Sequence, residues 1–254
     1  MNAIEVSDLS VAYRVLTDPT SSLKDYTFRL LKRQVRYERI WALREVTFTV
    51  PRGSIFCIIG PNGAGKSTLV KVLGQILPPS TGRVIVRGSS AVLADLGAGF
   101  EADLTGKENI VLYGAYLGRD PKLMRRDAEE IAEWAGVSAF LDVPLRAYSS
   151  GMLARLGFAI ATACEPEVVL VDEVLAVGDE TFRRRAVERL ERLILHGSTA
   201  VVVSHGLDAV VEMANQVMLL ESGRISELGA PSTVVAAYRE RAEASEGQIE
   251  RVTS

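Results

Sequence analysis

Apolar residues along this chain follow two patterns, short strand-like runs and longer stretches with helical spacing. Residues Val46–Val50 (VTFTV) alternate apolar and polar positions, as in a half-buried strand. The apolar runs SIFCII, EVVLVDE and STAVVVSHG each predict a strand that is buried on both faces. STLVKVLGQIL and ETFRRRAVERLERLILHG are typical of helices, so strands and helices take turns. This order predicts an α/β fold with a mostly parallel sheet covered by helices on both faces.

Three further segments complete the predicted organisation. RVIVRG is typical of another strand, and QVMLLESGRISELG of a hairpin with Ser222-Gly223 at its turn. Helical spacing over residues 101–163 interrupts the alternation and indicates a helical subdomain inserted into the core. We therefore expect one domain over residues 1–235 and a polar tail over 236–254 that frays.

Composition narrows the class of protein. The chain has 254 residues and a net charge of −3, which argues against a nucleic-acid-binding protein that relies on bulk positive charge. Cys57 and Cys164 lie in apolar settings, as expected of reduced core cysteines. The N-terminus is acidic and does not resemble a signal peptide, and the longest apolar runs are far shorter than the ~20 residues that span a bilayer. A cytosolic location is the expectation.

The segment GPNGAGKST follows a predicted strand, precedes a predicted helix and fits the P-loop pattern G-x-x-x-x-G-K-[ST]. Its glycines allow backbone N–H groups to turn toward phosphate oxygens, and the helix N-terminus favours negative charge. The lysine of this pattern reaches the β- and γ-phosphates, and the following hydroxyl binds Mg²⁺. The predicted nucleotide-binding residues are Gly60, Pro61, Asn62, Gly63, Ala64, Gly65, Lys66, Ser67 and Thr68.

Candidate hydrolytic residues follow two later strands. Asp172 and Glu173 end the apolar strand VVLVDE, where the first suits a Mg²⁺ shell and the second can orient or deprotonate the attacking water. His205 ends the strand AVVVSH, so we expect it in the ligand crevice as a γ-phosphate contact. His196, near the end of a charged helix, is interpreted as a helix-end residue instead.

With the P-loop, VVLVDE and His205 in this order, the sequence resembles the ATP-binding cassette of ABC transporters. That family carries a signature, normally Leu-Ser-Gly-Gly-Gln, upstream of the aspartate, and YSSGM fills its place here. The resemblance implies that Ser149, Ser150 and Gly151 contact the γ-phosphate of ATP held by a second copy, in a head-to-tail dimer. Arg155 matches the basic residue usually found after the signature.

Two more positions take roles from the same resemblance. AVGD corresponds to the D-loop, which passes between subunits and ends here at Asp179. Tyr13 stands where an aromatic residue usually stacks on adenine.

Departures from the ordinary cassette narrow the resemblance. Ordinary cassettes carry a glutamine between the P-loop and the signature, at a position that falls near Leu96-Gly97 here. This chain has no glutamine between Ile76 and Asn215, and Met152 replaces the glutamine of the signature. With VDEVLAVGD in place of Asp-Glu-Pro-Thr, this is similar to the subfamily that exports O-antigen, teichoic acid and related lipid-linked glycans. Membership implies an ATPase on the cytoplasmic face of the membrane, which drives a separate multi-span permease. The alternatives are export of a drug or lipid, a soluble ABC protein acting on DNA or ribosomes, and a catalytically silent cassette.

The segment TSSLKDYTFRLLKRQVRYERIWAL adds a basic, amphipathic stretch over residues 20–43. One hypothesis places it at the membrane surface, near anionic headgroups or the glycolipid entry, and the other makes it a solvated helix packed on the cassette. Its basic residues are Lys24, Arg29, Lys32, Arg33, Arg36 and Arg39. Some polysaccharide cassettes carry a C-terminal carbohydrate-binding domain, and the short stretch after SELGAP leads us to expect none here.

Overall fold

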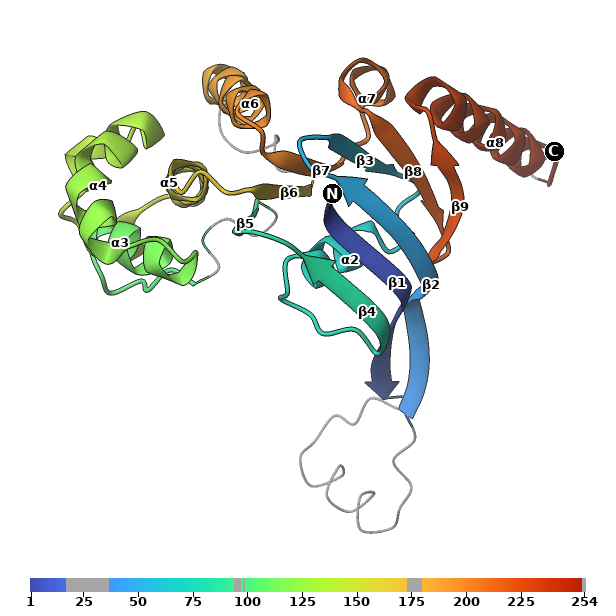
Figure 1. Ribbon diagram of the computed structural model, residues 1–254, viewed down its shortest axis with the longest axis horizontal. Helices are drawn as coiled ribbons and strands as arrows, with labels where there is room; N and C mark the ends of the chain where they lie inside the picture. Colours follow the sequence, from blue (N-terminus) through green and yellow to red (C-terminus); the bar gives the residue numbers. More distant parts are fainter. Residues whose placement is uncertain (17–36, 94–96, 98, 173–179, 253–254) are drawn as a thin grey trace, which may run out of the picture.

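The computed structural model describes residues 1–16, 37–93, 97, 99–172 and 180–252, and its strands form two sheets (Figure 1). The central sheet has the order β5-β6-β7-β3-β8-β9, in which all neighbours are parallel except the β8–β9 hairpin. Its strands are β3 (Ile55–Ile59), β5 (Ser90–Val92), β6 (Val168–Asp172), β7 (Thr199–Val203), β8 (Gln216–Glu221) and β9 (Arg224–Gly229). The predicted α/β class with a mostly parallel sheet is confirmed.

The central strands are buried because their apolar runs face helices or the second sheet on both sides. In β3, Phe56 and Ile58 pack with residues of the second sheet, whereas Cys57 and Ile59 pack with residues of β8 and of the last helix. Between β8 and β9, Ser222 and Gly223 both have positive φ (48° and 77°), as a tight hairpin turn requires. The predicted hairpin and its turn are confirmed.

The second sheet is antiparallel, with the order β2-β1-β4. Its strands are β1 (Asn2–Leu16), β2 (Tyr37–Pro51) and β4 (Thr81–Val86). β2 begins at Tyr37, so residues 37–43 of the basic segment are strand and the helical interpretation is wrong for them. They pair with β1, where Tyr13 faces Ile40, and this pairing satisfies their backbone groups. Residues 17–36 lie outside the described part of the chain.

The region over 101–163 is helical, as predicted, and is built from α3 (Gly106–Tyr116), α4 (Pro121–Ala135), α5 (Ser150–Ala163) and two short 3₁₀ turns, Ser138–Phe140 and Leu145–Ala147. These elements share a hydrophobic core of their own, which includes Ile110, Met124 and Leu156. The first helix starts with a capping box between Thr105 and Glu108. Figure 1 shows α3 and α4 at the left, away from the antiparallel sheet.

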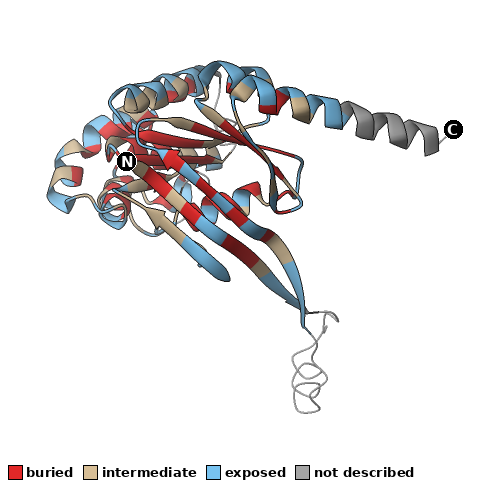
Figure 2. Ribbon diagram, turned by 45° about the vertical axis from the view of Figure 1, so that its right-hand side comes forward, coloured by how far each residue is buried: buried red, intermediate tan, exposed pale blue. Residues whose placement is uncertain are grey.

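The remaining helices are α2 (Lys66–Leu73), α6 (Glu180–Leu195), α7 (Leu207–Met213) and α8 (Pro231–Val252). α2 is shorter than predicted, because the chain leaves the helix at Gly74. Residues 236–252 of the expected tail continue α8, where Arg241 ion-pairs with Glu221 and Glu227 of the β8–β9 hairpin; that the tail frays stays a prediction. Figure 2 shows the buried residues concentrated in the two sheets. None of the helices that the structure describes is both long enough and apolar enough to cross a bilayer.

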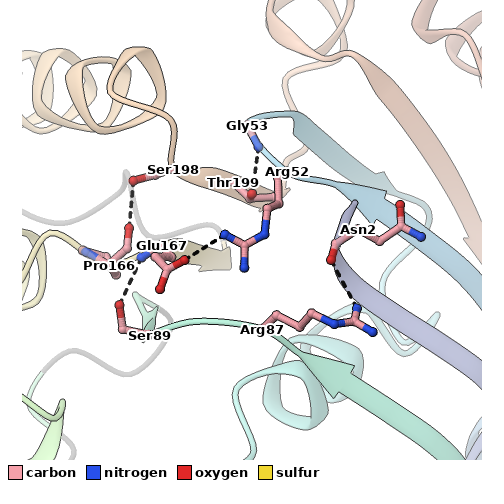
Figure 3. A network of polar contacts seen from close by, with 9 residues as sticks. All are labelled: Asn2, Arg52, Gly53, Arg87, Ser89, Pro166, Glu167, Ser198 and Thr199. Atoms are coloured by element: carbon pink, nitrogen blue, oxygen red, sulfur yellow. Dashed lines mark hydrogen bonds and ion pairs between the residues drawn. The ribbon is translucent and has the colours of Figure 1, made fainter.

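A polar network fastens the antiparallel sheet to the amino ends of the parallel strands (Figure 3). Arg52, just after β2, forms an ion pair of 3.0 Å with Glu167, just before β6. The neighbouring Gly53 N–H donates to Thr199 Oγ1 at 3.0 Å, and Ser198 Oγ donates to the carbonyl of Pro166 at 2.7 Å. These contacts tie the amino ends of β6 and β7 to the antiparallel sheet, and sheets of this kind usually bind a nucleotide outside the carboxyl ends of their strands.

Candidate nucleotide-binding site

The loop between β3 and α2 has a backbone that only glycine can adopt at two positions. Gly60 has φ of 144°, and a Cβ there would lie 2.1 Å from the carbonyl oxygen of Leu220. Gly65 has φ of 104°, and a Cβ there would lie 2.4 Å from the carbonyl oxygen of Ala42. The backbones of both sheets therefore lie in close contact with this loop and fix its conformation. The turn that results is the cradle expected of a phosphate-binding loop.

Lys66 is the first residue of α2 and is only 6% exposed. Its ammonium group donates to the carbonyl oxygens of Gly60 at 2.8 Å and Pro61 at 3.0 Å. The side chain thus folds back along the loop, and its charge lies beside the start of the helix, where the dipole also favours an anion. Ser67 is exposed in the same turn. The loop, its lysine and its hydroxyl lie together as the sequence predicts.

Asp172 lies at the carboxyl end of β6. It pairs with Val203 of β7, which in turn pairs with Ile58 of β3, so the three residues form one row across the sheet. His205 follows two residues after Val203 and is exposed. β7 ends at Val203, so His205 lies in the connection to α7 rather than in the strand as predicted. Both side chains belong to the edge of the sheet from which the P-loop leaves.

Tyr13 is near the start of α2 although it is far from the P-loop in sequence. Its hydroxyl lies 3.4 Å from Thr68 Oγ1, and its side chain is 41% exposed. The opposite residue of β2, Ile40, is also exposed, so an aromatic ring and an aliphatic side chain flank this approach to the loop. An exposed apolar pair beside a phosphate cradle suits a nucleobase.

The segment YSSGM forms the start of α5. Ser149 is the N-cap, and its Oγ accepts a hydrogen bond of 3.2 Å from the N–H of Met152. Ser150 is exposed, and a Cβ on Gly151 would meet only the Ser149 hydroxyl, at 4.0 Å. The first turn of α5 therefore presents hydroxyls and backbone N–H groups in the open.

Three predicted positions lie outside the described residues: Glu173, Asp179 and Leu96. The neighbouring Gly97 is described and has φ of 103°, with its carbonyl accepting from the N–H of Phe100 at 2.9 Å. The roles assigned to Glu173 and Asp179 stay predictions.

Asn109 organises the segment that follows Phe100, and sequence reasoning missed it. It is fully buried in α3, its Oδ1 accepts from the N–H of Glu101 at 2.8 Å, and its Nδ2 donates to the carbonyls of Glu101 and Leu104. The sequence indicates a special role for Asn109 only by placing a polar residue on the apolar side of a helix that begins with a capping box. The amide sets how residues 101–105 enter the helical region.

The strand–loop–helix cradle, the buried lysine and the acidic strand end define a P-loop nucleotide-binding protein. A family model described as ABC transporter matches residues 43–176. The chain belongs to the ABC transporter family and carries that family's ATP-binding, ATP-hydrolysing domain.

Similar proteins extend this assignment over almost the whole chain. The O-antigen export system ATP-binding protein RfbB of Klebsiella pneumoniae is 34% identical over 93% of this chain and 97% of its own length. RfbB of Myxococcus xanthus is 38% identical over 98% of this chain, which spans 58% of that protein. The teichoic acids export ATP-binding protein TagH of Bacillus cereus is 35% identical over 93% of this chain, which spans 42% of it.

Solved structures support the fold. A dimeric ATP-binding cassette in a post-hydrolysis state with ADP and Pi covers 90% of this chain, with a TM-score of 0.69 and 20% identity. An ATP-binding subunit of an ABC transporter covers 99%, with a TM-score of 0.72 and 21% identity.

Proposed function

We propose that this chain is the ATP-hydrolysing subunit of an exporter of lipid-linked polysaccharide, such as O-antigen, teichoic acid or a related glycan. One observation carries the proposal: a complete P-loop cradle, with Lys66 buried against it, lies in a chain whose relatives are ATP-binding proteins of O-antigen and teichoic acid export. The missing glutamine near Gly97 and the sequence VDEVLAVGD support this assignment within the family.

The proposed roles of the site residues follow from their positions. Lys66 and the backbone N–H groups of residues 60–68, apart from Pro61, which has none, bind the phosphates, and Tyr13 stacks on the adenine. Glu173 orients or deprotonates the attacking water, and His205 contacts the γ-phosphate.

The residues proposed for Mg²⁺ are Ser67 and Asp172. Hydroxyl and carboxylate oxygens are ligands that this ion accepts, so the donor set fits. When bound, Mg²⁺ supplies positive charge that offsets the charge on the phosphates.

The proposed ATP site is completed by a second copy of the chain. The first turn of α5, with Ser149, Ser150 and Gly151, offers the hydroxyls and N–H groups that bind a phosphate, and Asp179 is proposed to belong to the loop that passes between the subunits. Exposure of this turn in the single chain supports a role toward another molecule. ATP closes such a dimer, and hydrolysis with product release reopens it.

The proposed location is the cytoplasmic face of the cell membrane, through a multi-span permease subunit that converts closure into movement of the glycolipid. The basic segment over residues 20–40 is proposed to lie near anionic headgroups. Its described end supports this, because Arg39 of β2 lies directly opposite Arg14 of β1 and both are exposed. Like charges in this arrangement repel unless an anion lies between them.

The experiment that tests the proposal uses the chain together with its own membrane subunit. Glu173→Gln should give a dimer that traps ATP with little phosphate release, and cells carrying it should retain the glycan on the inner side of the membrane. Wild-type turnover in this variant contradicts the role of Glu173. Normal glycan export with abolished turnover contradicts the function itself.

A further inference from the structure

A cavity of about 1020 Å³ opens between α4, α6 and the C-terminal end of α5. Its walls come from these helices and from the connections that follow α5 and α6, so it is separate from the turn between β3 and α2. Figure 1 shows α4 and α6 on either side of α5. A recess of this volume is large enough for a small molecule.

Three arginines of α6 line this cavity: Arg185, Arg189 and Arg192. Their spacing places them in one stripe along the helix. Like charges at such spacings destabilise a helix, so their convergence on one recess needs a compensating interaction. Arg119 and Arg126 also line the cavity, each beside a carboxylate of its own, Glu165 and Asp127.

Trp134 of α4 holds two of these guanidinium groups at the cavity. The guanidinium carbon of Arg189 lies 4.7 Å and that of Arg185 5.0 Å from the centre of the indole ring. Arg185 also donates to the carbonyl of Trp134 at 3.0 Å, and Phe158 stacks on the same indole at 5.4 Å. The two groups are therefore positioned before any ligand arrives.

Burial lowers the pKa of Arg189; Glu130 and Glu165 act to raise it, and Arg192 and Arg185 to lower it further. In the part of the chain that the structure describes, no carboxylate lies within ion-pair distance of Arg189 or Arg192. A charge withdrawn from water costs free energy until an anion pairs with it.

The acidic residues of the cavity are mostly engaged elsewhere. Asp127 bonds to its neighbour Arg126 at 2.6 Å, and Glu165 lies 3.9 Å from Arg119. Glu167 pairs with Arg52, outside the cavity (Figure 3). Glu130 and Glu188 also line the cavity, so two carboxylates face the three arginines of α6. The stripe keeps an excess of positive charge.

We propose that this cavity binds a small, soluble, phosphate-bearing anion, with Arg185 and Arg189 as its main ligands and Arg192 beside them. The planar fork of a guanidinium matches two phosphate oxygens at once, and an anion here would offset the repulsion within the stripe. The site is distinct from the proposed ATP site and does not depend on the proposed export function.

The test follows the fluorescence of Trp134 while inorganic pyrophosphate is added at constant ionic strength. Trp41 is replaced by Phe so that one indole reports, and saturating fluorescent ADP keeps the P-loop occupied and shows whether pyrophosphate displaces it. We expect a saturable change in Trp134 emission with no loss of bound ADP.

Two variants on α6 carry the same loss of charge. Arg189→Gln should raise the half-saturating pyrophosphate concentration at least tenfold, whereas Arg184→Gln, on the same helix but outside the cavity lining, should leave it unchanged. Arg185→Lys keeps the charge but loses the fork, and should also weaken binding. Unchanged ADP binding shows that the variants are folded, and calorimetry on Arg192→Gln gives a second measurement.

A linear response to pyrophosphate overturns the proposal. Equal half-saturation in Arg189→Gln and Arg184→Gln also overturns it, as does a signal that appears only when ADP is displaced.

Discussion

The ammonium group of Lys66 lies 2.8 Å from the carbonyl oxygen of Gly60 and donates a hydrogen bond to it. This bond spans the whole loop, from the residue that follows β3 to the first residue of α2. A neutral carbonyl is a weaker partner for an ammonium than a phosphate oxygen. The side chain is therefore positioned to exchange this carbonyl for a phosphate oxygen when a nucleotide binds.

Lys66→Met should therefore abolish hydrolysis without unfolding the protein. The thioether fills similar space and leaves no buried charge, so we expect the free energy of unfolding to change by about 1 kcal/mol or less. Phosphate release should fall by about two orders of magnitude or more, because the transferred charge loses its fixed counter-charge. Lys71→Met, exposed on the same helix, is the matched control and should retain turnover. Equal activity in the two variants would contradict the assignment of Lys66.

Gly60→Ala and Gly63→Ala compare the cost of a methyl group at a loop position packed against backbone with its cost at a loop position in open space. A methyl group on Gly60 meets the Leu220 backbone, whereas nothing lies within 4 Å of one on Gly63, although its φ is also positive at 78°. Gly60→Ala should lower the free energy of unfolding by more than about 3 kcal/mol, and Gly63→Ala by roughly 1 kcal/mol. Urea unfolding of both variants measures this difference. Similar losses would show that the two sheets do not fix the loop.

The parallel sheet and the P-loop could be predicted because each depends on local pattern. Continuous apolar runs indicated the buried strands, and the spacing of Gly60, Gly65 and Lys66 indicated the cradle. β1 and the first half of β2 could not be placed in this way. Residues 37–43 have mixed polarity, and their strand conformation depends on pairing with β1, a contact between distant segments.

The same limit applies to the site. The strand pattern predicts His205 at the carboxyl end of β7. The strand ends two residues earlier, so His205 lies in the following connection but at the same edge of the sheet. Asn109 was missed because its function is a set of hydrogen bonds to the backbone of residues 101–105, which sequence spacing does not reveal. The cavity beside Trp134 needs three helices to meet, so no single segment predicts it.

Cys57 should contribute to alkaline unfolding. Burial raises the pKa of this thiol to about 12, above its ordinary value of 9.0. The folded chain therefore holds more protons than the unfolded chain between these values. The stabilisation is fully present below pH 9 and is lost as pH rises toward 12, with a slope of about 1.4 kcal/mol per pH unit.

Cys57→Ala should lower stability at neutral pH but show a shallower loss between pH 9 and 12 than the parent chain. Urea unfolding at several pH values gives both slopes. An identical pH dependence in the two proteins would mean that the thiol does not titrate from a buried state.

The opposed pair Arg14 and Arg39 allows a test of the membrane-surface proposal. Arg14→Glu with Arg39→Glu reverses the charge at the described end of the basic segment but preserves the cross-strand arrangement. We expect glycan export in cells to fall severalfold while phosphate release in detergent stays close to the parent value, because attraction to anionic headgroups is lost. Arg83→Glu with Arg184→Glu is a control with the same change of charge at exposed residues elsewhere on the surface. Equal loss of export and turnover would contradict the proposal.

Ser149 decides whether YSSGM is a phosphate-binding turn or only a helix cap. Aspartate is as good an N-cap as serine, so Ser149→Asp should preserve the free energy of unfolding, whereas Ser149→Ala should lower it by about 1 kcal/mol. If this turn contacts the γ-phosphate, the added carboxylate repels it and turnover should fall by at least tenfold in the stable aspartate variant.

Mixing Ser149→Asp with Lys66→Met chains then tests the contribution of the second copy, because one of the two sites in each mixed dimer combines an intact lysine with an intact serine turn. Turnover that neither variant has alone should return on mixing. Full activity of Ser149→Asp would show that YSSGM is only a helix cap. An inactive mixture would contradict the proposed contact between copies.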